Sequence, residues 1–177
     1  MSTAATELPN RAFAHDLGQV TVAGGRLQVV FRRRYAKPIE KVWAAVTVPE
    51  RLADWLADAE FEPRVGAPIR FTWAGPDYSM AGKVLAYDPP RTFAWTWPLD
   101  GRDTVVSFEL EPDGDGCWLT LTHRGLDPTG KDGNGVRAGW HAHLEGVADA
   151  IEGRATAWTT VVAREKQIAP LYPKLST

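Results

Sequence analysis

The feature that most constrains the fold is a long region, residues 59–123, in which apolar and polar side chains alternate. Alternation with a period of two is typical of β-strands that bury one face. Turn residues interrupt the region at short intervals, as in the Gly- and Asp-rich run 113–116, which indicates strands joined by tight turns. No alternation of strands with helices appears, so the sequence predicts an antiparallel meander and argues against a parallel doubly wound sheet.

An amphipathic segment after the meander predicts a long helix over 136–151, ended by Gly153. Before the meander, a strand is expected over 27–35, and a short helix follows it from Pro38, because proline is tolerated at the first helical position. Val48-Pro49 interrupts this helix, and Leu52, Trp55 and Leu56 indicate a second short helix. A curved sheet with one helix across its concave face buries the apolar sides of all these strands and helices together. The predicted fold class is therefore α+β, a helix-grip fold with a curved antiparallel sheet, two short helices and a long C-terminal helix.

The chain of 177 residues is divided into one domain and two flanking segments. Residues 1–17 show no periodic apolar pattern and are expected to form a flexible arm. The domain is placed at 18–153, a length typical of single domains. The remaining residues, 154–177, are interpreted as a C-terminal extension in which 157–168 could form a further helix.

Composition and charge exclude several classes of protein. The chain has 20 basic and 22 acidic residues, a net charge of −2, which argues against a nucleic-acid partner. It contains no apolar run long enough to insert into a membrane and no secretory signal pattern at its start, so a cytoplasmic location is expected. The single cysteine, Cys117, excludes an intramolecular disulfide and a cysteine-rich zinc site.

The eight tryptophans are the unusual part of the composition. Strand alternation places many aromatic side chains on inward faces, where they line either a filled core or a pocket for a small apolar ligand. Both interpretations stay open. The candidate ligand-binding residues are Phe71, Trp73, Phe93, Trp95, Trp97, Phe108, His123, Trp140 and His143.

Two histidines are the candidates for polar chemistry in such a pocket. His123 ends an otherwise apolar strand face, and His143 flanks the stripe of the long helix on the cavity side. Each could donate or accept a pocket hydrogen bond, act as a general acid or base, or simply be satisfied by the backbone. His141 is expected to face solvent, so the histidines do not converge as metal ligands. No nucleophile or phosphate-loop motif occurs, and no cofactor or metal is expected.

Several runs resemble a known family when they are taken together and in order. The run RYAKPIEKVW at 34–43 resembles the first strand and helix of START-like (SRPBCC) domains, and VPERLADW at 48–55 resembles their second helix. Within that superfamily, the similarity is greatest to the branch homologous to the heat-shock-chaperone ATPase activator (AHSA-type). The resemblance covers roughly 27–153, and its further matches are DPPR at 88–91, WTW at 95–97, LTLTH at 119–123 and Gly139-Trp140.

The resemblance implies a helix-grip fold but leaves the function open, because one fold hosts many functions. The leading hypothesis is that the domain binds a hydrophobic or aromatic small molecule, lipid or polyketide-like, in a cavity between the sheet and the C-terminal helix. The first alternative is a protein-interaction role as a cofactor of a heat-shock chaperone. The second is a cyclase- or aromatase-like enzyme, which the apolar inward faces disfavour.

Overall fold

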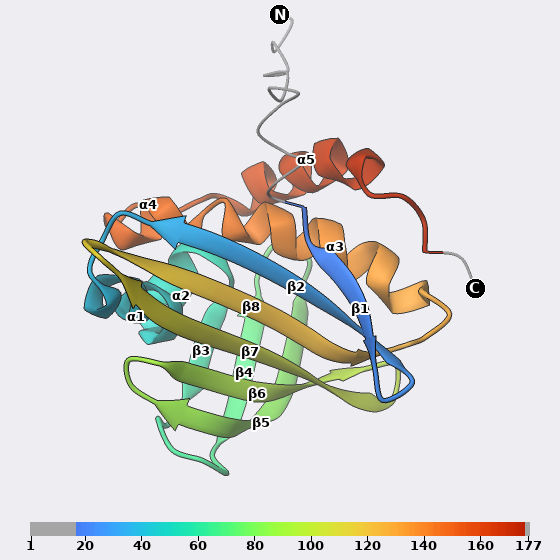
Figure 1. Ribbon diagram of the computed structural model, residues 1–177, viewed down its shortest axis with the longest axis horizontal. Coiled ribbons are helices and arrows are strands. Elements are labelled where there is room, and N and C mark those ends of the chain that lie inside the picture. The colour runs from blue at the N-terminus through green and yellow to red at the C-terminus, as the bar shows by residue number, and fades with distance from the viewer. Residues whose placement is uncertain (1–16, 176–177) are drawn as a thin grey trace, which may run out of the picture.

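A single antiparallel sheet forms the framework of the protein (Figure 1). The computed structural model describes residues 17–175, so the expected N-terminal arm lies almost entirely outside the described residues. The sheet has eight strands in the order β1-β2-β8-β7-β6-β5-β4-β3. The strands are β1 (Gln19–Ala23), β2 (Arg26–Tyr35), β3 (Asp58–Phe61), β4 (Pro68–Trp73), β5 (Tyr78–Asp88), β6 (Thr92–Leu99), β7 (Arg102–Asp113) and β8 (Gly116–Leu126).

The helices gather on the concave side of this sheet. Figure 1 shows the sheet curling so that β3 and β4 lie behind the other strands, with α1 and α2 at one end and α3 running along the open side. This arrangement confirms the predicted α+β helix-grip fold. The helices are α1 (Ile39–Thr47), α2 (Pro49–Trp55), α3 (Lys131–Leu144), α4 (Val147–Ile151) and α5 (Trp158–Ile168), followed by a 3-10 turn at Ala169–Leu171.

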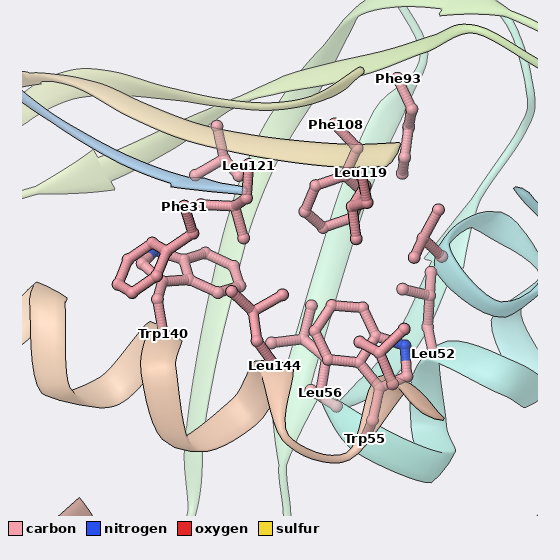
Figure 2. Packing of buried hydrophobic residues seen from close by; sticks show 14 of the residues in the cluster. Phe31, Leu52, Trp55, Leu56, Phe93, Phe108, Leu119, Leu121, Trp140 and Leu144 are labelled. Atoms are coloured by element: carbon pink, nitrogen blue, oxygen red, sulfur yellow. The ribbon is translucent and has the colours of Figure 1, made fainter. Parts of the chain in front are cut away.

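The core lies between the concave face of the sheet, α2 and α3 (Figure 2). Phe108 and Leu121 reach inward from the sheet, while Trp55 and Trp140 reach toward them from the two helices. Each such side chain contributes about 1.5–3 kcal/mol when it is fully buried. The indole of Trp55 also donates a hydrogen bond of 2.9 Å to the carbonyl of Ala45, which ties α2 to α1.

The prediction of one continuous helix over 136–151 is wrong in two respects. The helix begins earlier, at Lys131, directly after Gly130, whose φ of +81° suits glycine. It is also interrupted between α3 and α4 at Gly146, where an added Cβ would lie 3.0 Å from the Cβ of Trp55. Glycines in the first turns of α3 made that stretch look like a loop, but packing on the sheet outweighs their low helix propensity.

The expectation that His141 faces solvent is also wrong, since its exposed fraction is 2%. Its Nδ1 lies 2.9 Å from the hydroxyl of Tyr172, and that hydroxyl accepts a hydrogen bond from the backbone N–H of Gly18. A second link runs from Arg137, whose guanidinium donates to the carbonyl of Pro173 at 2.6 Å. Residues 154–175 therefore include a segment that packs against α3, which a helical pattern alone does not reveal.

Candidate ligand-binding cavity

A cavity of about 470 Å³ lies between the sheet and the helices α3 and α5. Its volume falls in the range typical of small-molecule sites, ~300–1,000 Å³. Strands β4, β5, β6 and β8 form one wall, α3 and α5 form the other, and Leu56 after α2 closes one side. Most of the lining is apolar or aromatic, so the cavity suits a ligand with a substantial apolar body.

The aromatic side chains of the lining form an unbroken series of ring contacts. Successive ring centroids lie 5.4–6.4 Å apart, the range in which aromatic rings attract one another. The series joins the sheet to both helices and so holds the two walls at a set distance. In order, its members are Tyr78, Trp73, Trp97, Trp140, His143 and Trp158.

Two glycines on α3 leave room for the cavity. Gly135 and Gly139 are one helical turn apart and line the cavity. A Cβ added at either position would have no neighbouring atom within 4 Å. Glycine inside a helix costs about 0.5–1 kcal/mol relative to alanine. Here the missing side chains keep open space between α3 and the sheet, next to the large ring of Trp140.

The hydrogen bonds of His123 determine its tautomer. The indole Nε1–H of Trp140 donates to His123 Nδ1 at 3.0 Å, so Nδ1 carries no proton. The hydroxyl of Thr104 donates to the carbonyl of Trp97 at 2.6 Å, so His123 Nε2–H donates to that hydroxyl oxygen, 2.7 Å away. Burial lowers the pKa of His123 to about 3. His123 is therefore a neutral, fully hydrogen-bonded group that fastens α3 to β8.

His143 keeps one ring nitrogen available. Its Nδ1 lies 2.9 Å from the carbonyl oxygen of Trp55, and because a carbonyl can only accept, Nδ1 carries the proton. Burial lowers the pKa of His143, although the bond to Trp55 acts in the opposite direction. The neutral ring then leaves Nε2 unprotonated, on a side chain that lines the cavity. In this position, His143 can accept a hydrogen bond from a ligand.

Glu165 on α5 is the charged member of the lining. Burial raises the pKa of its carboxyl group above the usual range. Among the described residues that line the cavity there is no Lys or Arg. Glu165 and His143 each bring a polar group to a predominantly aromatic wall.

The nine predicted site residues divide into two groups. Trp73, Trp97, His123, Trp140 and His143 line the cavity. The other four have no exposed surface and do not line it; they pack among themselves and behind the wall, with Phe71 and Trp95, for example, 5.3 Å apart. These four fully buried side chains are Phe71, Phe93, Trp95 and Phe108.

Several lining residues were not foreseen from the sequence. Tyr78 pairs directly with Trp73 across β4 and β5. Pairing the two strands around the turn between them would have placed Tyr78 beside Trp73. The pair Gly135 and Gly139, spaced to share a helix face, was a further usable signal. For Trp158 and Glu165 no signal existed, because nothing in the pattern of residues 154–177 says where α5 docks.

Other kinds of site find no support in the part of the chain that the structure describes. Within residues 17–175, no three His, Cys, Asp or Glu side chains converge in a way that could hold a metal ion. Nor is any helix in that range long and apolar enough to span a membrane. The thiol of Cys117 is buried, and that burial raises its pKa, which is the opposite of what a nucleophilic cysteine requires.

The fold and the cavity together define a START-like (SRPBCC) domain of the AHSA type. The model of the family "Activator of Hsp90 ATPase homolog 1-like protein" matches residues 36–152, and the chain belongs to this family. Among curated proteins, none matches the chain at a significant level.

Solved structures with the same fold include three that cover most of this chain. CalU16 from Micromonospora echinospora is 23% identical with a TM-score of 0.67, covering 85% of this chain and 90% of its own. Protein MLL2253 from Mesorhizobium loti is 27% identical with a TM-score of 0.66, covering 73% of this chain and 99% of its own. DynU16, a protein of the dynemicin biosynthetic locus, is 23% identical with a TM-score of 0.66, covering 72% of this chain and 48% of its own.

Proposed function

We propose that the protein binds a hydrophobic or aromatic small molecule in the cavity between the sheet and α3. The observation that carries the proposal is the cavity of about 470 Å³ with its continuous aromatic wall. Trp73, Trp97 and Trp140 would contact the apolar body of the ligand, and His143 Nε2 would accept a hydrogen bond from its polar end. The fully buried aromatic residues behind them would support the wall rather than touch the ligand.

The similarity to DynU16 is in keeping with this proposal, since that protein belongs to a biosynthetic locus. A polyketide-like or lipid-like aromatic compound is therefore the class of ligand to try first. His123 would hold Trp140 in place and leave proton transfer to other groups, because both of its ring nitrogens are engaged. This engagement favours binding over a cyclase-like reaction.

A cavity-filling substitution tests the proposal. Gly139→Phe places a ring in the open space beside Trp140, and we expect it to abolish binding of a fluorescent apolar probe such as 9-anthracenemethanol while the fold is retained. Gly139→Ala is the matched control: its Cβ meets no atom within 4 Å, so it should keep binding and gain about 0.5–1 kcal/mol of stability. Unchanged affinity in Gly139→Phe would show that the cavity is not the binding site.

Membership of the family named for the activator of the Hsp90 ATPase favours one second candidate, a cofactor of a heat-shock chaperone. Such a role would use the outer surface rather than the cavity. The purified protein should then raise the ATPase rate of an Hsp90-type chaperone, and Gly139→Phe should raise it equally. No change in that rate would remove this candidate.

A further inference from the structure

The charge of the cavity wall carries an inference about the ligand, which rests on the binding function proposed above. Glu165 is the one carboxylate among the described residues of the wall, and no Lys or Arg lines it. The wall histidines add no positive charge near pH 7, because burial lowers the pKa of both His123 and His143. At neutral pH the described residues of the wall therefore include one acidic side chain and no positively charged one.

None of the described side chains forms an ion pair with Glu165. Its neighbour on α5, Arg164, makes two bonds of 2.7 Å to Glu145 instead. Within residues 17–175 the carboxylate of Glu165 takes part in no ion pair or hydrogen bond. Burial is what raises the pKa of Glu165, with no cation to offset the cost of desolvation. A cationic group in the cavity would supply the missing counter-charge.

The aromatic part of the wall is suited to the same kind of group. Four tryptophans line the cavity together with Tyr78, and their ring contacts run from the sheet wall to the helix wall. The negative face of an indole ring attracts a cation, most strongly where water is excluded. Aromatic walls alone would accept any apolar ligand, whereas aromatic walls with one uncompensated carboxylate favour a positively charged one.

We propose that the cavity selects hydrophobic or aromatic ligands that carry an amine in its ammonium form, with Glu165 as the counter-ion and the tryptophan rings as the surrounding walls. The same wall discriminates against carboxylate ligands such as fatty acids. A carboxylate would enter a space whose described lining has no Lys or Arg and already contains an acidic side chain.

Three probes that share one ring system and differ in charge test this selection. They are 9-(aminomethyl)anthracene, 9-anthracenemethanol and 9-anthracenecarboxylic acid, titrated near pH 7 and followed by quenching of tryptophan fluorescence. We expect the amine to bind about tenfold or more tightly than the acid, with the neutral alcohol between them. Equal or tighter binding of the acid would overturn the proposed charge selection. Binding of the alcohol would in that case still support the binding function of the cavity.

Two variants locate the source of the preference. Glu165→Gln should bring the affinities for the amine and the alcohol to within about threefold of each other. Glu109→Gln makes the same change of net charge on an exposed residue of β7 outside the cavity wall, and it should keep the preference of the unmodified chain. A preference for the amine that survives in Glu165→Gln would contradict the assignment of the counter-ion. Failure of all three probes to bind would overturn both this inference and the binding function.

Discussion

Replacing His123 with glutamine should remove much of the sensitivity of the fold to mild acid. The folded chain holds this imidazole neutral, with a pKa of about 3, whereas an unfolded histidine titrates near 6.5. Between those values the unfolded state binds a proton that the folded state does not, so stability falls as the pH drops below about 6.5. A proton on Nδ1 would also take away the acceptor for Trp140.

The size of the effect follows from the two pKa values. Lowering the pH from about 7.5 to about 5 should cost the folded state about 2 kcal/mol through His123 alone. Glutamine offers one acceptor for Trp140 and one donor for Thr104 but does not titrate, so His123→Gln should lose about 2 kcal/mol less than the unmodified chain over the same interval.

Urea denaturation at the two pH values measures this difference. Comparing how each protein changes with pH cancels the packing cost of the substitution and the share of the pH dependence that belongs to His143, whose pKa is also lowered. The same pH dependence in His123→Gln as in the unmodified chain would show that His123 does not cause the acid sensitivity of the fold. An NMR titration gives a second reading, since the ring carbons of His123 should keep constant shifts down to about pH 5.

Two further substitutions test how the walls of the cavity are held. Gly82→Ala would drive a Cβ into the backbone carbonyl of Thr96 on β6, so we expect a loss of about 1–3 kcal/mol in urea denaturation; a loss below about 0.5 kcal/mol would contradict the close approach of the two strands. Arg164→Ala removes both bonds to Glu145 that join α5 to the end of α3, and amide hydrogen exchange in 158–168 should then quicken while exchange in the sheet stays unchanged. Unaltered exchange in α5 would show that its apolar contacts alone hold it.

The sheet was predictable because alternation is a direct consequence of burying one face of each strand. The turns predicted between the strands also lie close to the turns in the structure, since residues such as Gly101 and Gly114 adopt positive φ there. The start of α3 was not predictable from local signals, because Gly133 and Gly135 lower helix propensity where the sheet and the C-terminal segment supply the packing that holds the helix.

The site was only partly predictable for a related reason. Strand periodicity indicates which aromatic residues point inward but not which of them border empty space, so Phe93 and Trp97 look alike in the sequence although only Trp97 lines the cavity. The positions of Trp158 and Glu165 depend on where α5 docks, which is a tertiary contact between segments without a shared pattern. The same docking buries His141.

Indole NMR shifts during titration with 9-anthracenemethanol test the central claim most directly. The ¹H–¹⁵N indole signals of the four cavity tryptophans, Trp73, Trp97, Trp140 and Trp158, should shift with one shared saturation curve. Trp43 and Trp118 do not line the cavity and should stay unchanged, which makes them internal controls. Shifts confined to these two, or no shift at all at saturating probe, would contradict a ligand-binding cavity between the sheet and α3.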